Sequence, residues 1–175
     1  MFSFNTYSKW HALFVHTGEE DNVKERIHYR FGEDELAALV PKRRMRERKN
    51  GNWSYRTRTL FPGYVLINGN INEEQYYKVK EIPGVITFIK DKNGPLPVDE
   101  SEINLLLRFM KGKEIIESSR VLMEGSKIIV TEGPLYGMEG LIQSIDKRKG
   151  RAKVRINFIG QPRVVELSVS IFNTA

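Results

Sequence analysis

The chain has 175 residues, 40% of them hydrophobic, which is enough for one ordinary domain or two small ones without disulfides or metal. It contains no cysteine, so disulfide frameworks, thiolate nucleophiles and thiolate-bound metal centres are excluded. Lysine and arginine number 28 against 22 acidic residues, and the net charge of +6 favours an anionic partner such as nucleic acid.

The first 111 residues alternate between strand and helix patterns. A capping-box spacing begins at Thr17 and a second helix start at Asn72, each followed by apolar residues at helical spacing. Strands are predicted at 10–16, 36–40, 64–68 and 85–89, and a last helix follows Asp99. This order, β-α-β-β-α-β with one added helix, predicts an α+β fold, a ferredoxin-like antiparallel α/β sandwich.

Beyond residue 111 the helical pattern gives way to strands. Residues 112–124 are polar and charged, so we predict a linker between a domain at 1–111 and a second domain at 125–175. Short strand patterns with glycine-containing turns lie at 127–131, 141–145, 152–158 and 163–167. They predict a small SH3-like β-barrel.

Three segments carry a family resemblance. Residues 125–150 (GSKIIVTEGPLYGMEGLIQSIDKRKG) closely resemble the KOW motif, a strand, a glycine-rich turn and a second strand. Residues 56–67 (RTRTLFPGYVLI) and 82–89 (IPGVITFI) look like two segments of the N-terminal (NGN) domain of NusG-type factors. Because both halves occur in the expected order from Lys9 to Phe172, the chain resembles the NusG family of transcription elongation factors.

The resemblance implies a non-enzymatic factor whose N-terminal domain binds the clamp region of RNA polymerase. It also implies that the barrel recruits a partner. By similarity we assign the polymerase-binding patch to Phe14, Phe61, Tyr64, Leu66 and Phe88. Ordinary core packing is the alternative for each of these side chains. A ribosome-associated or general KOW-type RNA-binding protein is the alternative for the whole chain.

A basic hairpin is predicted at residues 42–58, with Asn50-Gly51 at its turn and Glu47 as its only acidic residue. Cations interleaved with aromatic rings are typical of nucleic-acid contacts, because phosphates attract the cations and bases stack on the rings. The residues expected to contact upstream or non-template DNA are Arg44, Arg46, Arg48, Lys49 and Trp53. A solvated edge hairpin that charge protects from aggregation is the alternative.

A second basic cluster lies in the predicted barrel. Alternation along a strand directs Arg151, Lys153 and Arg155 to one face. The residues expected to bind structured RNA are Lys147, Arg148, Lys149, Arg151, Lys153, Arg155 and Arg163. A charged outer face that only keeps the domain in solution is the alternative.

One position departs from the family pattern. Many NusG proteins carry a phenylalanine directly after the Gly-Pro of the KOW loop, where it helps to bind Rho or a small-subunit ribosomal protein, whereas this chain has Leu135 followed by Tyr136. With the basic cluster, this change indicates a specialised paralogue resembling the LoaP group of antitermination factors, which recognise RNA through the KOW domain.

Catalytic and membrane functions find no support in the sequence. The three histidines, His11, His16 and His28, have no metal-ligand spacing, and we predict no catalytic residue, metal or cofactor. The first residues lack the pattern of a signal peptide, and no run of about eighteen apolar residues occurs. We therefore expect a cytoplasmic monomer without a membrane partner.

Overall fold

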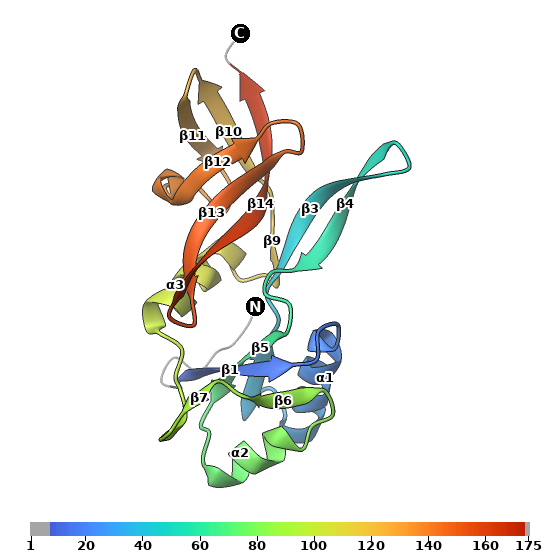
Figure 1. Ribbon diagram of the computed structural model, residues 1–175, viewed down its shortest axis with the longest axis vertical. Helices are drawn as coiled ribbons and strands as arrows, with labels where there is room; N and C mark the ends of the chain where they lie inside the picture. Colours follow the sequence, from blue (N-terminus) through green and yellow to red (C-terminus); the bar gives the residue numbers. More distant parts are fainter. Residues whose placement is uncertain (1–7, 174–175) are drawn as a thin grey trace. The chain divides into compact units, whose positions relative to one another are not determined.

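A computed structural model describes residues 8–173, and the chain folds into two compact units (Figure 1). The first unit contains the chain up to residue 40 together with residues 61–103. The second contains residues 41–60 and the chain from residue 104 onward. The basic hairpin therefore groups with the C-terminal strands, although it is encoded in the N-terminal half of the sequence.

The first unit is an antiparallel sheet with strand order β2-β5-β1-β6, next to helices α1 and α2 (Figure 1). Its elements are β1 (Trp10–Val15), α1 (Glu20–Phe31), β2 (Leu36–Leu39), β5 (Tyr64–Gly69), α2 (Glu73–Lys80), β6 (Val85–Phe88), β7 (Lys90–Asp91) and β8 (Gly94–Pro95). Helix α3 (Glu100–Met110) follows and continues into the second unit. The predicted ferredoxin-like sandwich is confirmed.

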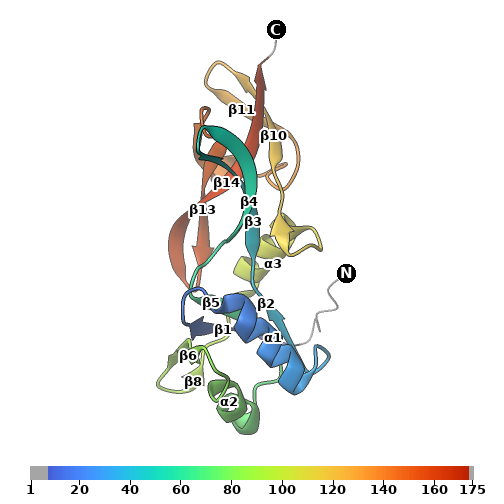
Figure 2. The same cartoon turned by 90° about the vertical axis from the view of Figure 1, so that its right-hand side faces the viewer.

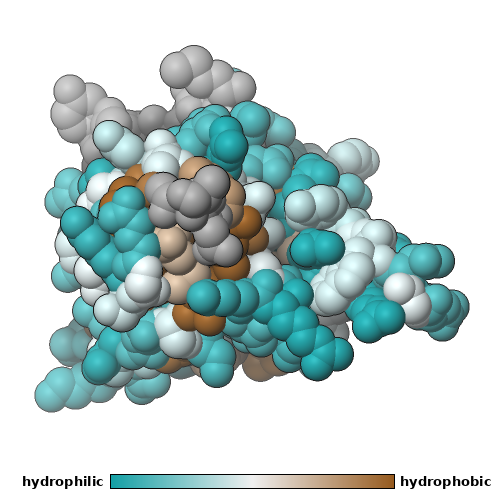
Figure 3. Space-filling model, turned by 90° about the horizontal axis from the view of Figure 1, so that it is seen from above, coloured by the Kyte–Doolittle hydropathy of each residue, from teal (hydrophilic) through white to brown (hydrophobic). Residues whose placement is uncertain are grey.

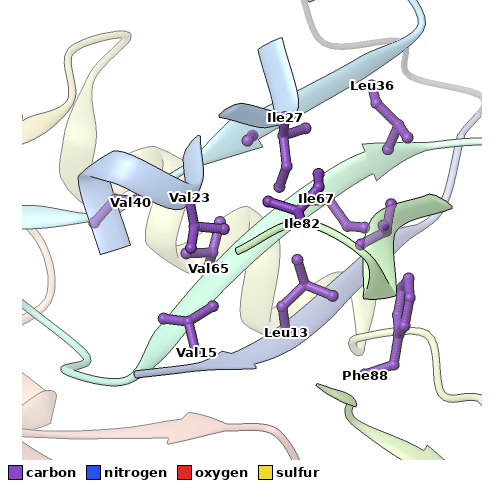
Figure 4. Close-up of a cluster of buried hydrophobic side chains, with 12 residues drawn as sticks. Leu13, Val15, Val23, Ile27, Leu36, Val40, Val65, Ile67, Ile82 and Phe88 are labelled. Carbon is purple, nitrogen blue, oxygen red and sulfur yellow. The ribbon is translucent and has the colours of Figure 1, made fainter. Parts of the chain in front are cut away.

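Strand alternation builds the core of this unit. Leu13 of β1 and Val65 and Ile67 of β5 are fully buried in one cluster with Val23 and Ile27 of α1 (Figure 4). Side chains on one strand face share a direction at every second residue, so the intervening residues lie on the other face of the sheet. Burial of each such aliphatic side chain contributes about 1.5–3 kcal/mol.

Helix α1 begins at Glu20, two residues later than a capping pattern with Thr17 as the N-cap predicts, and the Glu20 side chain accepts hydrogen bonds from Gly18 and Gly63. Its buried carboxylate accepts hydrogen bonds from the backbone nitrogens of Gly63, at 2.7 Å, and Gly18, at 2.9 Å. A buried carboxylate is tolerated when backbone donors satisfy it. These bonds connect the start of α1 to the turn that precedes Tyr64.

The second unit contains a curled sheet with strand order β11-β10-β14-β13-β12, and the predicted barrel class is confirmed. Its strands and short helix are β10 (Ser119–Glu124), β11 (Lys127–Glu132), η1 (Glu139–Leu141), β12 (Ile142–Asp146), β13 (Arg151–Phe158) and β14 (Gln161–Asn173). The long strand β14 pairs first with β13 and then, in parallel, with β10. It therefore joins the two halves of the sheet.

The segment 112–124, expected to be a linker, carries strands β9 (Ile115–Ile116) and β10. Ile116, Ser119 and Val121 are buried, whereas Arg120 is exposed. In the sequence, the alternation of apolar and polar residues over this segment is too short and too polar to distinguish strands from a linker. Across residues 8–173, no helix is long and apolar enough to span a membrane.

A hydrogen bond from a backbone amide to His28 makes the stability of the first unit sensitive to pH. The Ala38 backbone nitrogen donates to Nε2 of His28 at 2.8 Å, which requires that nitrogen to be unprotonated. Burial lowers the pKa of His28; Lys24 acts in the same direction, and the Glu33 carboxylate opposes it. Burial likewise lowers the pKa of His11, with a smaller contribution from Lys9.

We expect the free energy of unfolding to fall as the pH decreases below the ordinary histidine value of 6.5, because the unfolded chain takes up protons more readily than the folded one. The His28→Gln variant, whose amide oxygen can still accept from Ala38, should lose part of this dependence in urea unfolding curves between neutral and acidic pH. His16→Gln is the control, since that side chain is exposed. Equal pH dependence in wild type and His28→Gln would contradict the assignment.

Candidate nucleic-acid interface

Strand β13 presents alternating cations on its outer face, as predicted. Ala152, Val154 and Ile156 are buried, whereas Lys153 and Arg155 are exposed. The side chains of the exposed pair therefore share one face of the sheet. This face offers two cations to solvent without disturbing the barrel core.

The turn between β12 and β13, residues 147–150, adds three more exposed cations. It is held by Asp146, whose Oδ1 accepts a hydrogen bond from the backbone nitrogen of Lys149 at 2.9 Å. Gly150 follows with φ of 64°, and its carbonyl accepts from the Val169 backbone nitrogen at 2.9 Å. We call these residues the basic turn; its exposed cations are Lys147, Arg148 and Lys149.

The other two cations predicted to bind RNA are positioned differently. Arg151 is largely covered and donates to Glu166 Oε2 at 2.9 Å and to the Arg46 carbonyl at 3.2 Å. Arg163 lies opposite the inward-facing Ile156, and its guanidinium is 5.3 Å from the centre of the Phe158 ring. Arg151 shares the outer face with Lys153 and Arg155, but protein acceptors engage its guanidinium, whereas Arg163 lies on the opposite face with Ile156. We therefore leave both out of the proposed RNA contacts.

The basic hairpin consists of β3 (Lys42–Lys49) and β4 (Asn52–Thr59) and has two different faces. Met45 is buried, so the face that it shares with Arg43 is directed inward. The opposite face, the hairpin outer face, comprises Arg44, Arg46, Arg48, Trp53 and Tyr55. Arg46 lies 4.5 Å from the centre of the Trp53 ring. Lys49 belongs to the Met45 face, contrary to its predicted grouping with the other cations.

Hydrogen bonds and ion pairs attach the hairpin to the barrel. Strand β3 pairs in parallel with β9, and Nε of Arg44 lies 2.9 Å from Oε2 of Glu117. Arg43 donates to the backbone carbonyl of Glu166. Burial lowers the pKa of Arg43, and the Glu166 carboxylate opposes this shift. We call Arg43, Arg151 and Glu166 the hairpin–barrel cluster.

Sequence reasoning missed this cluster because Arg43 is more than a hundred residues away from Arg151 and Glu166 along the chain. The one available signal was that Glu166 is the only acidic residue in β14, just as Glu47 is the only one in the hairpin. Glu47 accepts two hydrogen bonds from Arg58, at 2.8 Å and 2.7 Å, and these bonds lower its pKa. In both segments, the single acidic residue thus forms an ion pair with an arginine of the same chain, Glu47 with Arg58 and Glu166 with Arg151.

In the first unit, the proposed polymerase patch divides into surface and buried residues. Phe14 is 39% exposed and Tyr64 is partly exposed; the two lie opposite each other on β1 and β5, with ring centres 4.8 Å apart. We call them the aromatic pair. Phe61 and Leu66 are buried, and Phe88 lies in the core cluster, stacked on Tyr76. These three side chains are not available to a partner.

The KOW loop of the barrel presents Tyr136 rather than the residue before it. Leu135 is fully buried, and its backbone nitrogen donates to Ser119 Oγ at 3.0 Å. Tyr136 is 62% exposed. Gly133 has φ of 103°, and a Cβ there would lie 2.6 Å from the Ser119 Cα, so a larger residue cannot occupy this position without a backbone shift.

Within residues 8–173, no group of three or more potential ligands among His, Cys, Asp and Glu could hold a metal ion. The hairpin outer face combines cations with aromatic rings, and the basic turn adds further exposed cations. Such surfaces bind polyanions.

Comparisons with known proteins agree with this architecture. The family model described as transcription termination factor NusG matches residues 8–107. The termination/antitermination protein NusG of Pasteurella multocida is 32% identical over 174 residues, covering 94% of each chain. That of Rickettsia prowazekii is 28% identical over 172 residues, covering 95% of this chain and 90% of its own. A solved Thermotoga maritima structure, described as domain interaction in NusG, superposes with a TM-score of 0.61 at 25% identity, covering 92% and 93%.

The fold, the KOW loop and these matches together define a NusG-like transcription termination/antitermination factor. The chain belongs to the NusG family. Transcription factors of this family are not enzymes.

Gly150 should be required for the basic turn. The Gly150→Ala variant should lose about 1–3 kcal/mol of unfolding free energy, because φ is positive and the new Cβ would lie 2.9 Å from the Val169 carbonyl. Gly125→Ala is the matched control: φ is also positive there, but the Cβ would meet no atom within 4 Å. Chemical denaturation of the two variants measures the difference, and equal losses would show that contact with Val169 is unimportant.

Proposed function

We propose that this chain promotes processive antitermination by binding RNA polymerase through its first unit and structured RNA through its barrel. The observation that carries the RNA proposal is the display of five exposed cations from one ordered turn and one strand face. Double-stranded RNA is bound mainly through its phosphates and 2′-hydroxyls, and these are groups that such cations can contact. A ribosome-associated or general RNA-binding role predicts RNA binding without polymerase binding.

The barrel surface supports a specialised role resembling that of the LoaP group. At the position where many NusG proteins carry a phenylalanine, this chain has the buried Leu135, and the adjacent Tyr136 is exposed. Because the KOW loop lacks this phenylalanine, we propose that the barrel binds RNA in place of Rho or a ribosomal protein. The exposed cations of the same barrel supply the charge that such a change requires.

The aromatic pair supports the polymerase contact. Aromatic side chains that already contact each other lose little rotamer freedom on binding, and such side chains often dominate interface energies. We propose that Phe14 and Tyr64 contact the clamp region of RNA polymerase. The hairpin outer face supports a nucleic-acid contact, for which upstream or non-template DNA is one candidate.

The RNA proposal predicts weaker binding and a weaker dependence on salt. In Lys149→Ala and Lys153→Ala, affinity for a structured RNA should fall, and the slope of log affinity against log salt should decrease by about one for each phosphate that the variant no longer neutralises. Lys127→Ala, an exposed cation on β11 of the same barrel, is the control. Fluorescence anisotropy titrations at several salt concentrations measure both quantities. Unchanged affinity and slope in the first two variants would refute RNA binding by the barrel.

The polymerase proposal predicts loss of association on removing the aromatic pair. The Phe14→Ala/Tyr64→Ala variant should bind RNA polymerase about thirtyfold more weakly or worse, because even one hot-spot ring contributes about 2 kcal/mol or more. Tyr77→Ala, which removes another exposed ring from the same unit, should bind like wild type. Equilibrium binding to purified polymerase and read-through of a terminator in vitro provide the readouts. Wild-type association in the double variant would remove these residues from the interface.

A further inference from the structure

The basic hairpin belongs to the same compact unit as the barrel, and its contacts fix its direction along the barrel. Arg43 of β3 contacts the carbonyl of Glu166, and three residues later the Arg46 carbonyl accepts from Arg151. Arg151 is paired across the sheet with Ser168. From residue 43 to residue 46, strand β3 therefore runs in the same direction along the barrel as β14 runs from residue 166 to residue 168.

This direction places the hairpin tip near the basic turn. Arg151 is the first residue of β13 and directly follows residues 147–150. Because β3 advances toward that end of the barrel, its last residues and the tip at residues 50–51 extend past the start of β13. Figures 1 and 2 show the tip of β3 and β4 on the same side of the unit as the turn between β12 and β13.

The two elements are chemically complementary. The basic turn carries three exposed cations, but residues 146–151 include no aromatic ring. The hairpin outer face supplies Trp53, which is 37% exposed, and Tyr55, which is 55% exposed, next to its own arginines. Viewed from this end, hydrophilic side chains cover the protruding hairpin, with residues of intermediate hydropathy among them (Figure 3).

We propose that the hairpin outer face and the basic turn form one composite RNA-binding surface. The basic turn binds the phosphates of a paired stem, and Trp53 and Tyr55 stack on unpaired bases next to that stem. The ligand class is therefore RNA with adjoining paired and unpaired nucleotides, such as a stem-loop. This inference rests on the proposed RNA binding by the barrel and adds an element from the N-terminal half of the sequence to that site.

The attachment of the hairpin favours RNA held jointly with the barrel over a separate DNA contact. Strand β3 is fixed by pairing with β9, by the Arg44–Glu117 ion pair and by the hairpin–barrel cluster. A hairpin fixed in this way presents its rings at a constant position relative to the turn. Preorganisation of this kind reduces the entropy cost when one ligand contacts both elements.

The test compares an RNA stem-loop with a randomised loop and the blunt RNA duplex of the same stem, each titrated with the full chain. In Trp53→Ala/Tyr55→Ala, affinity for the stem-loop should fall about tenfold or more, as expected when base stacking is removed, while affinity for the blunt duplex stays within about twofold. Lys149→Ala should weaken binding to both RNAs. Tyr77→Ala, which removes an exposed ring outside this unit, is the control, and circular dichroism melting verifies folding.

The outcomes separate this inference from the proposed function. If Lys149→Ala weakens binding and the hairpin double variant binds the stem-loop like wild type, the composite surface is wrong and RNA binding by the barrel stands. If neither variant changes affinity for either RNA, both proposals fail. A single-stranded DNA oligonucleotide is titrated in parallel; if the hairpin variant weakens binding only to this DNA, the hairpin is a DNA-binding element and the inference is overturned.

Discussion

The contact between the basic hairpin and the barrel centres on one residue, Glu166, which supplies acceptors to arginines of both elements. The hairpin and β13 both carry excess positive charge, and two such elements repel each other when they approach. Glu166 offsets this repulsion because its carboxylate accepts from Arg151 while its backbone carbonyl accepts from Arg43. A partly buried ion pair is stabilised further when hydrogen bonds satisfy the remaining donors, and Arg151 meets this condition in part, because its Nη2 donates to the Arg46 carbonyl while its buried Nε has no partner. The cluster therefore holds two basic elements side by side.

This use of arginine separates structural cations from binding cations. Arg43 and Arg151 are engaged by protein acceptors, and Arg58 is paired with Glu47. The exposed cations of the basic turn and of Lys153 and Arg155 remain on the outside of a rigid strand and an ordered turn. The basic composition of a segment thus overstates its binding surface, because part of the charge maintains the fold that presents the rest.

Local rules predicted more of the fold than of the site. Alternation correctly assigned Ala152 and Lys153 to opposite faces, and the order of elements gave the ferredoxin-like sandwich. Phe88 was assigned to the patch by similarity, but the register of β6 on β1 places it opposite the buried Leu13. No local pattern contains that register. The environment of Arg151 was equally inaccessible, since its acceptors come from β3 and β14.

The aromatic pair shows how a few buried bonds can prepare an exposed contact. The backbone nitrogen of Gly63 donates to the buried carboxylate of Glu20, so the chain entering β5 is fixed immediately before Tyr64. Pairing of β5 with β1 then sets Phe14 beside that ring. Each ring covers part of the other, which reduces the apolar surface exposed to water in the free protein. Because strand pairing already determines their positions, little ordering remains for a partner to impose, and most of the burial energy is available for binding.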